Sequence, residues 1–203
     1  MARERGRRAG GADGDDSALN RILDATSELL AANGEEALRL NDVAKRARVS
    51  LSTVYAHFPS RDELLLAAVR RWMHENIFRT MPAPENGDTF DRYIIRCFRH
   101  VFGPWADNPT MLTVFIRASL LPGGDRMTDD GNAALSQAAD LIQPYDPEWF
   151  ADVAMILEHL TDGLLRKFAS GDLDVPAITA RFERTVAVLF ASQPNGVAHI
   201  TSA

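Results

Sequence analysis

The sequence predicts an all-α protein of about nine helices, and three observations support this fold class. Apolar residues recur at intervals of three and four along most of the chain, which is the period of an α-helix. The breaks between these segments fall at glycine and proline residues. No segment alternates apolar and polar residues between hairpin turns, as β-strands would. Hydrophobic residues make up 46% of the chain and charged residues 25%, so we expect a packed core with a solvated surface.

The chain begins with residues 1–16, which are rich in Arg, Gly and Asp, and we expect them to form a disordered basic arm. Such an arm can enter the minor groove of DNA, although a solvated tail is the simpler interpretation. The first helix is predicted to start near Ser17 and to stop at Gly34, because glycine adopts the left-handed conformation at a helix C-terminus without strain. Its stripe at helical spacing consists of Leu19, Ile22, Leu23, Thr26, Leu29 and Leu30.

Two short helices are predicted next. The first carries Leu40, Val43, Ala44 and Ala47 on one face and is followed by a tight connection at residues 48–49. Ser50 is the expected N-cap of the second, over residues 51–58, because its hydroxyl can accept a hydrogen bond from an exposed N–H group. Pro59 ends this helix, since proline disfavours helical geometry in the residue before it.

Ser60 and Glu63 have the spacing of a capping box, which predicts the start of a longer fourth helix. Its apolar stripe consists of Leu64, Leu65, Ala68, Val69, Trp72 and Met73. Four helices, two of them very short and joined by a tight turn, outline a helix-turn-helix module. We place this DNA-binding domain at residues 17–73.

The composition changes after residue 80, and residues 81–88 (MPAPENGD) are predicted to form a loop. Asp146 and Pro147 have the pattern of an N-cap followed by proline at the first helical position. Breaks are expected at residues 103–104, 122–124, 144 and 171–174. The predicted helices cover residues 89–102, 109–120, 129–143, 147–170 and 176–191, within a second domain at 74–203.

The net charge of −6 is unevenly distributed along the chain. Residues 1–80 hold 13 basic and 12 acidic side chains, whereas residues 81–203 hold 9 and 16. Within residues 39–61, Asp42 is the only acidic residue beside five basic ones. A local basic face of this kind can bind phosphates while the rest of the molecule stays acidic. The acidic second half argues against an unspecific architectural DNA binder, which would need broad basicity.

Several classes of protein are disfavoured by the sequence. No run of about 18 apolar residues predicts a membrane span, and no apolar segment of a secretory signal follows the basic N-terminus. Cys97 is the single cysteine, so we expect no disulfide, no metal site and a location in the reducing cytoplasm. The five histidines lie in no catalytic motif, and no Gly-rich phosphate loop occurs. We therefore expect no cofactor, and a helical-bundle enzyme is the weaker alternative.

The stretch DVAKRARVSLSTVYAHFPSRDELL at residues 42–65 resembles the DNA-binding domain of the TetR (tetracycline-repressor-like) family of transcriptional regulators. The resemblance is close over residues 18–72 and most specific in the block TVYAHFPSRDEL at 53–64. Over the remainder of the chain, only the number of helices and the closing pair of long helices are similar to those of the family. Membership implies the fold, a homodimer and binding of double-stranded DNA through the helix-turn-helix, but it does not imply an inducer.

The helix over residues 51–58 is expected to lie in the major groove, where side chains near its N-terminus reach base edges. Val54 and Phe58 point together into the core on a helical wheel. Three side chains point away from the core, toward DNA: Ser52, Thr53 and Ala56. Tyr55 and His57 flank this face, where a hydroxyl and an imidazole can reach phosphates.

Some of these residues have a second interpretation. For Tyr55 a place at the rim of the core is the weaker alternative, whereas Leu51 can equally belong to the core or contact a thymine methyl group. The resemblance implies that Arg39 and Arg61 bind phosphates and that Asn41 reads a base. The predicted DNA-contacting residues are Arg39, Asn41, Arg48, Ser50, Leu51, Ser52, Thr53, Tyr55, Ala56, His57 and Arg61.

The chain departs from the family pattern at two positions. The turn usually has glycine where Arg48 stands, and a left-handed backbone there would cost a non-glycine residue about 1 kcal/mol. The second helix usually begins with threonine where Arg39 stands. A cation is unfavourable for the helix dipole at that end but can attract a DNA phosphate.

The helices between the module and the closing pair are rich in aromatic residues and methionine, which favours an apolar cavity for a small molecule. For any single aromatic residue, core packing is the simpler role, and Cys97 is most simply a small buried hydrophobic residue. Arg96 is a further candidate polar member of the cavity. The predicted ligand-binding residues are Tyr93, Phe98, Trp105, Met111, Phe115, Arg117, Met155 and His159.

The patterns and the family resemblance together predict a repressor that binds a palindromic operator as a dimer and is released by a mainly hydrophobic effector. The apolar stripes of residues 147–170 and 176–191 suit either a dimer interface or an intramolecular core, and the resemblance favours the dimer. A constitutive repressor and an activator are the alternative kinds of regulator.

Overall fold

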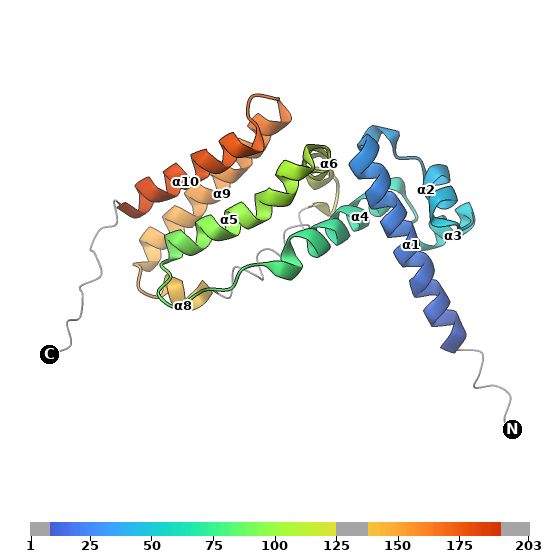
Figure 1. Cartoon of the computed structure of the whole chain (residues 1–203), viewed down its shortest axis with the longest axis horizontal. Helices are drawn as coiled ribbons and strands as arrows, with labels where there is room; N and C mark the ends of the chain where they lie inside the picture. Colours follow the sequence, from blue (N-terminus) through green and yellow to red (C-terminus); the bar gives the residue numbers. More distant parts are fainter. Residues whose placement is uncertain (1–8, 125–137, 192–203) are drawn as a thin grey trace, which may run out of the picture. The chain divides into compact units, whose positions relative to one another are not determined.

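The computed structural model describes residues 9–124 and 138–191. This part of the chain contains nine α-helices, two 3-10 helices and no strand, which confirms the predicted all-α class (Figure 1). The contacts divide the chain into two compact units. The first unit contains residues 1–76 and 108–128, and the second contains residues 77–107 and 129–203.

In the first unit, α1 (Ala9–Asn33) is the central helix. It packs against four others, α2 (Leu40–Ala47), α3 (Leu51–His57), α4 (Arg61–Asn76) and α6 (Pro109–Ser119). A 3-10 helix, η1 (Glu35–Ala37), joins α1 to α2. Each fully buried aliphatic side chain contributes about 1.5–3 kcal/mol to stability. The buried side chains of this core include Ile22, Leu30, Val43, Val54, Leu64, Leu65, Val69, Met111 and Leu112.

α1 starts at Ala9, earlier than the start predicted near Ser17. Ser17 lies inside the helix, where its hydroxyl accepts a hydrogen bond from Arg21 Nη1 at 2.8 Å. Once packing fixes the later turns, each added residue gains a backbone hydrogen bond, so the helix extends upstream at little cost. Of the predicted disordered arm, residues 1–8 lie outside the described residues and the part from Ala9 is helical. At the other end the prediction is confirmed, because Gly34 follows the helix with φ 72°.

α6 belongs to the first unit, which the sequence did not predict. Asn108 caps it by accepting the Met111 N–H at 3.1 Å, and Pro109 occupies its first position. The buried residues Met111 and Leu112 then join the core of the N-terminal helices. The division into a DNA-binding domain at 17–73 and a ligand-binding and dimerisation domain at 74–203 stays a prediction, because packing units do not report binding.

The second unit contains η2 (Phe78–Thr80), α5 (Phe90–Asp107), α8 (Ala139–Ile142), α9 (Pro147–Ala169) and α10 (Val175–Ala191). α10 packs against both α5 and α9 (Figure 1). Asp146 caps α9 by accepting the Trp149 N–H at 2.9 Å, as predicted. The two closing helices agree with the predicted ranges to within one residue.

α5 runs through the break predicted at residues 103–104 and ends at Asp107, so that prediction was wrong. Pro104 removes one backbone hydrogen bond and crowds the carbonyl four residues earlier. Phe102 and Trp105 are both buried, and their packing holds the last turn in spite of this cost. Of the helix predicted over 129–143, residues 129–137 lie outside the described residues, and the rest contains α8.

Candidate nucleic-acid interface

The turn between α2 and α3 depends on one arginine. Arg48 has φ 55° and ψ 46°, and it is the only residue other than glycine with a positive φ among the described residues. Its N–H donates to Lys45 O at 3.3 Å, and the Val49 N–H donates to Ala44 O at 3.0 Å. These two bonds form a Schellman motif, which closes α2 and turns the chain toward α3. The left-handed backbone considered from the sequence is therefore present at Arg48, with a cost of about 1 kcal/mol.

Three hydroxyl groups lie together at the start of α3. Ser50 Oγ accepts the Thr53 N–H at 3.0 Å, which confirms the predicted N-cap. The same oxygen lies 2.7 Å from Ser52 Oγ and 2.7 Å from Thr53 Oγ1. Each hydroxyl can donate one hydrogen bond and accept others. The cluster can therefore present donors and acceptors to base edges or to phosphate oxygens.

The remaining residues of α3 divide between two faces. Val54 and Phe58 are buried, so they attach the helix to the core as predicted. Tyr55 is 50% exposed, which places it outside the core rather than at its rim. The other predicted contact residues of α3 fall into two groups: Ser52 and Ala56 are exposed, while Leu51, Thr53 and His57 are half-buried.

Most of the basic side chains expected on this surface are already paired. Arg46 Nε lies 2.5 Å from Glu28 Oε2, and Lys45 Nζ lies 3.9 Å from Asp42 Oδ1. Arg39 and Arg48 are exposed and have no hydrogen-bond or ion-pair partner within the ranges that the structure describes. A paired cation must first give up its carboxylate partner before it can bind a phosphate. The two unpaired arginines, before α2 and at the turn, are therefore the cations most readily available to phosphates.

Arg61 is engaged within the first unit. Its Nε donates to Leu38 O at 3.3 Å, its Nη1 donates to Glu35 Oε1 at 3.2 Å, and its Nη2 donates to Glu35 O. These bonds hold η1 against the start of α4 and so fix the segment that leads into α2. The geometry favours a positioning role for Arg61, and its predicted phosphate contact stays a prediction. The acidic pair at residues 35–36, just before a basic stretch, was the sequence signal for this pairing.

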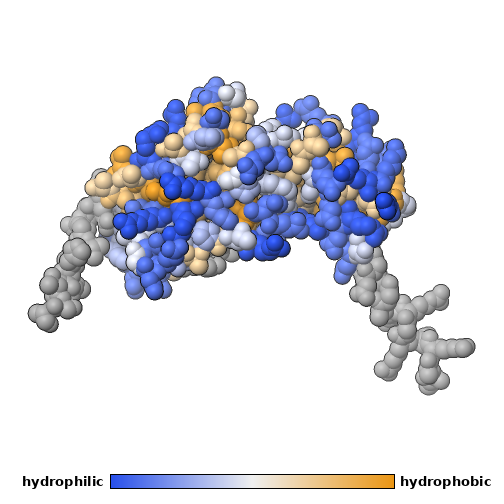
Figure 2. All heavy atoms as spheres, viewed as in Figure 1, coloured by the Kyte–Doolittle hydropathy of each residue, from blue (hydrophilic) through white to orange (hydrophobic). Residues whose placement is uncertain are grey.

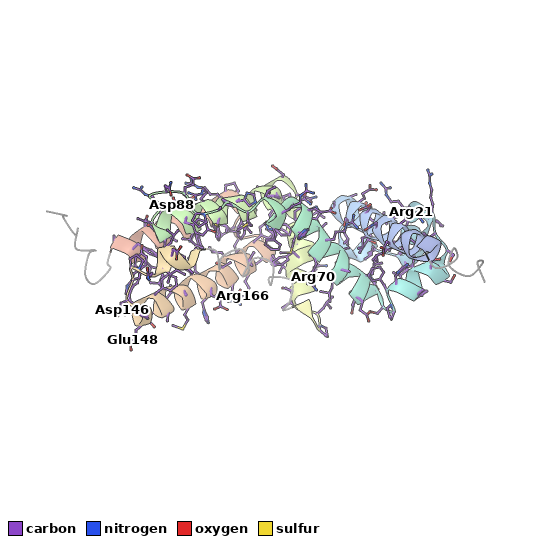
Figure 3. The ribbon with its side chains drawn as sticks, turned by 90° about the horizontal axis from the view of Figure 1, so that it is seen from below. Arg21, Arg70, Asp88, Asp146, Glu148 and Arg166 are labelled. Atoms are coloured by element: carbon purple, nitrogen blue, oxygen red, sulfur yellow. The ribbon has the colours of Figure 1, made fainter. Side chains whose placement is uncertain are left out.

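Two further arginines hold α1 to its neighbours, and neither was predicted from the sequence. Arg21, on α1, donates from Nε to Ala47 O at 3.2 Å, at the end of α2 (Figure 3). Arg71, on α4, reaches Asn20 Oδ1 at 2.6 Å and Asp24 Oδ1 at 2.9 Å. Contacts between residues so far apart in the sequence leave no local pattern, so only the folded chain reveals them.

The eight predicted ligand-binding residues do not share one unit. Met111, Phe115 and Arg117 lie on α6 in the first unit. Tyr93, Phe98 and Trp105 lie on α5 in the second unit and are buried. Met155 and His159 lie on α9 and are exposed, with His159 Nδ1 donating to Met155 O at 2.8 Å.

An aromatic cluster is the main feature around Tyr93. Its buried members are Phe90, Tyr93, Cys97 and Ala138, and partly buried residues packed against them are Met81, Ile94, Leu141, Ile142, Tyr145, Phe150 and Phe190. Burial raises the pKa of the Tyr93 hydroxyl to about 12. Burial likewise raises the pKa of the Cys97 thiol. Both groups therefore stay protonated at neutral pH, and Cys97 is the buried small residue that was predicted.

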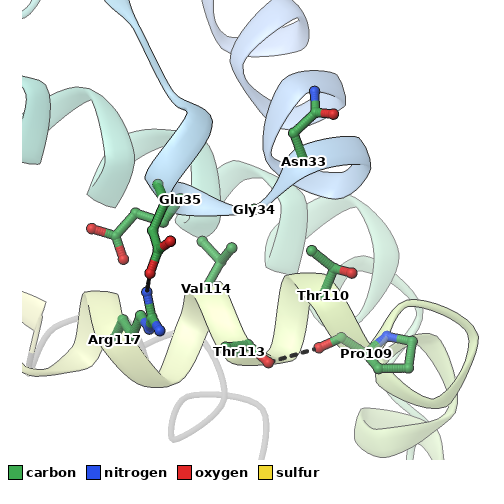
Figure 4. A pocket seen from close by; sticks show the side chains of 9 residues that line it. Asn33, Gly34, Glu35, Pro109, Thr110, Thr113, Val114 and Arg117 are labelled. Atoms are coloured by element: carbon green, nitrogen blue, oxygen red, sulfur yellow. Dashed lines mark hydrogen bonds and ion pairs between the residues drawn. The ribbon is translucent and has the colours of Figure 1, made fainter.

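Two surface hollows lie elsewhere. One, of about 350 Å³, lies between the end of α1, η1 and α6, where Arg117 Nη1 donates to Glu36 Oε1 at 2.9 Å (Figure 4). The other, of about 300 Å³, lies between α5 and α10, beside the ion pair of Arg99 and Glu183. Neither hollow includes a member of the aromatic cluster. Arg117 and Tyr93, both predicted polar members of one cavity, thus lie in different surroundings.

In the described ranges, no three His, Cys, Asp or Glu side chains lie close enough together to hold a metal ion. No helix in those ranges is long and apolar enough to cross a membrane.

Comparison with known proteins identifies the family. Residues 22–68 match the bacterial regulatory proteins of the tetR family, and residues 87–189 match the tetracyclin repressor-like C-terminal domain. The HTH-type transcriptional repressor KstR of Rhodococcus jostii is 47% identical over 51 residues, which cover 25% of this chain and 24% of that protein. The chain therefore matches about a quarter of the length of the KstR protein.

Solved structures resemble the fold over nearly the whole chain. A TetR transcriptional regulator from Rhodococcus sp. RHA1 has a TM-score of 0.67 at 18% identity, over 90% of this chain and 99% of that one. A TetR variant from Acinetobacter baumannii, in complex with minocycline, has a TM-score of 0.59 at 18% identity, over 85% and 93%. At these identities the likeness concerns the fold alone. The two family matches lead to one conclusion: the chain belongs to the tetR family of bacterial regulatory proteins, which are DNA-binding regulators and not enzymes.

Proposed function

We propose that this protein is a transcriptional repressor that binds a palindromic DNA operator as a homodimer and releases it when a mainly apolar small molecule binds. The observation that carries the proposal is the exposure of polar side chains on the outward face of α3. Tyr55, Ser52 and Ala56 are exposed there, while Val54 and Phe58 fix the opposite face in the core. A short helix supported in this way can enter the major groove with its outer side chains against base edges.

The chemistry of the surface suits both kinds of DNA contact. Phosphate contacts set position and give salt-dependent affinity, and Arg39 and Arg48 are the unpaired cations that can make them. Ser52, Thr53 and the exposed Asn41 are short polar side chains that can read base edges. Tyr55 and His57 complete the contact set, with a hydroxyl and an imidazole that can donate to the DNA backbone.

Exposed apolar side chains on the closing helices support a homodimer. Met155 and Ile156 on α9 are 53% and 41% exposed, and Val188 on α10 is 68% exposed. Apolar patches interrupt the hydrophilic surface over α10 (Figure 2). A second copy can cover these residues in a self-complementary, two-fold interface. Two copies would then present two α3 helices about 34–36 Å apart, one turn of DNA, or a multiple of that distance.

Two of the comparisons support a small-molecule effector and repression. The KstR relative is named a repressor, and the Acinetobacter baumannii protein of this fold was solved with minocycline, a small molecule. In this chain the aromatic cluster around Tyr93 is the apolar region that suits such a ligand. An effector that binds the DNA-free form more tightly shifts the population away from the operator. This function requires the cytoplasm, where the chromosome lies.

The proposal is tested by selecting duplexes from a random DNA library with the full chain. We expect a palindromic sequence to be enriched at physiological salt, and Ser52→Ala to change the preferred bases. The affinity for that duplex is then measured against salt concentration for Arg39→Ala, Arg48→Ala and Arg46→Ala. Each of the first two substitutions should reduce the slope of log K against log salt by about one, because one phosphate contact is lost.

Arg46→Ala is the matched control, because Arg46 is a neighbouring exposed arginine that is paired with Glu28. Its slope should stay closer to that of the unchanged protein. Failure to enrich any duplex would refute DNA binding. Equal slopes for all three variants would refute the assignment of the phosphate contacts. A reporter gene downstream of the selected duplex should be transcribed less when the protein is supplied, and more transcription would indicate an activator.

A further inference from the structure

Residues 81–88, between η2 and α5, form a segment that we call the strap. Met81, at its start, packs against the aromatic cluster of the second unit. Two side chains of α5 hold the rest of it. Tyr93 donates from its hydroxyl to Pro82 O at 3.3 Å, and Arg96 donates from Nη2 to Ala83 O at 3.1 Å. The strap therefore lies against the hydroxyl group of Tyr93, and the Tyr93 side chain is fully buried.

The strap has little backbone attachment of its own. Pro82 and Pro84 have no N–H to donate. The Met81 N–H bonds to Phe78 O at 3.3 Å, and the Asp88 N–H bonds to Glu85 O within the strap at 3.0 Å. Among the described residues, the only other hydrogen bonds between the strap and the rest of the second unit come from the side chains of Tyr93 and Arg96. A segment held by a few side-chain contacts can open locally without unfolding the unit.

Arg96 and Asp88 are the strongest of these attachments. Arg96 Nη1 lies 3.1 Å from Asp88 Oδ1, and Nη2 lies 2.6 Å from Oδ2, so the pair is bidentate (Figure 3 labels Asp88, beside α5). The Asp88 side chain is 8% exposed. Its hydrogen bonds to Arg96 lower the pKa of Asp88 to about 2, so the pair is charged at neutral pH.

The closed strap leaves one donor unsatisfied. Arg96 Nε is buried without a hydrogen-bond partner, and Glu85 Oε1 lies 3.9 Å away, beyond hydrogen-bond distance. An unpaired buried N–H is unfavourable, because it has lost its bond to water. Opening the strap hydrates this group, and this gain partly offsets the loss of the pair with Asp88.

We infer that the strap is the gate through which the effector reaches the aromatic cluster, with Arg96 and Asp88 as its latch. This inference rests on the proposed function. Tyr93 and Cys97 are buried, and neither of the two hollows described above touches their cluster, so movement of a covering segment would give a ligand access to it. The strap is such a covering segment, and few contacts hold it.

The opening also defines the class of ligand. When the strap leaves, the Tyr93 hydroxyl loses Pro82 O and needs a new acceptor. The surrounding side chains are Phe90, Phe150, Tyr145 and aliphatic residues. The site therefore takes a largely apolar, ring-bearing molecule with one hydrogen-bond acceptor, such as a carbonyl or ether oxygen, placed to accept from Tyr93.

The gate is tested with Nile red, a neutral apolar dye with a carbonyl acceptor, mixed rapidly with the full chain. Asp88→Asn removes the charge-assisted latch and should raise the association rate of the dye about tenfold. Hydrogen exchange should rise in peptides that cover residues 81–88. Glu183→Gln is the matched control, because it weakens another bidentate pair on α5, that of Arg99 with Glu183, which does not touch the strap. It should change neither measurement.

A second variant allows the gate to be tested even if Asp88→Asn does not fold. Tyr93→Phe removes the hydroxyl, and with it the bond to Pro82 O and the donor offered to the ligand. It should therefore raise the association rate of the dye while weakening its binding at equilibrium. Equal dye rates for the unchanged protein, Asp88→Asn and Tyr93→Phe would overturn the gate, as would equal increases in Asp88→Asn and Glu183→Gln. A purely structural role would lower the melting temperature of Asp88→Asn without changing the rate. Operator binding is measured separately, so loss of the proposed function is distinguishable from loss of the gate.

Discussion

At the scale of single residues, Arg48 combines backbone strain with a proposed role in DNA binding. Its left-handed backbone is the conformation that glycine adopts without strain, yet the position holds a long cationic side chain that is exposed. The resemblance to the family raised the question of strain at this residue, but only the folded backbone answers it. The same limit applies to Arg39, Arg46 and Arg61, because the sequence shows that all three are basic and does not show which of them is paired.

This combination at Arg48 predicts opposite effects of one substitution. Arg48→Gly should raise the free energy of unfolding by about 1 kcal/mol, because the strain is relieved, and should weaken operator binding, because a phosphate contact is lost. Arg48→Ala is the control, since it removes the charge and keeps the strain. Urea unfolding of the two variants measures the difference. If glycine and alanine gave equal stability, the assignment of strain would be wrong.

At the scale of helices, most boundaries were predictable because they depend on caps. Ser50, Ser60 and Asp146 accept hydrogen bonds from the N–H groups of residues three positions further on, as the local sequence indicates. The errors have another origin. α5 continues through Pro104, and α6 joins the first unit, because buried contacts between residues far apart in the sequence decide both features. The two short helices of the helix-turn-helix were predictable because local residues set their ends. The aromatic cluster was not, because it depends on contacts between residues far apart in the sequence.

The cap of α3 leads to a prediction for that helix. Ser50→Ala should lower stability by about 1 kcal/mol and should also weaken operator binding, because it disturbs the hydroxyl cluster with Ser52 and Thr53. Ser60→Ala removes the corresponding cap of α4 and is the control. It should lower stability by a similar amount and affect DNA binding less. Thermal unfolding and DNA titration measure both effects, and equal losses of affinity would contradict a special role for the cluster.

At the scale of the whole molecule, the proposed dimer needs a surface that a single chain leaves exposed. The apolar stripes of α9 and α10 had two interpretations, and the structure divides them. Val153 and Leu157 are buried within the chain, as are Ile178 and Val186, whereas Met155, Ile156 and Val188 remain exposed. The inner sides of the stripes are core, and the outer sides are available to a second copy.

This division predicts the effect of a charge on the outer side. Met155→Lys should shift the protein toward monomer, because two like charges would enter an apolar interface, and should reduce operator affinity. Leu120→Lys is the control, since Leu120 on the first unit is 83% exposed and lies outside the closing helices. Sedimentation over a range of concentrations measures the shift. A Met155→Lys protein that stays dimeric would place the interface elsewhere.

The interleaving of the two units has a consequence for how such a protein can be recombined. The first unit uses two stretches of chain, residues 1–76 and 108–128, and the second unit supplies the residues between them. No single cut point therefore separates them. A chimera that borrows only residues 1–76 would leave its α1 and α4 surfaces without Met111 and Leu112, so a functional graft must carry α6 as a second insert.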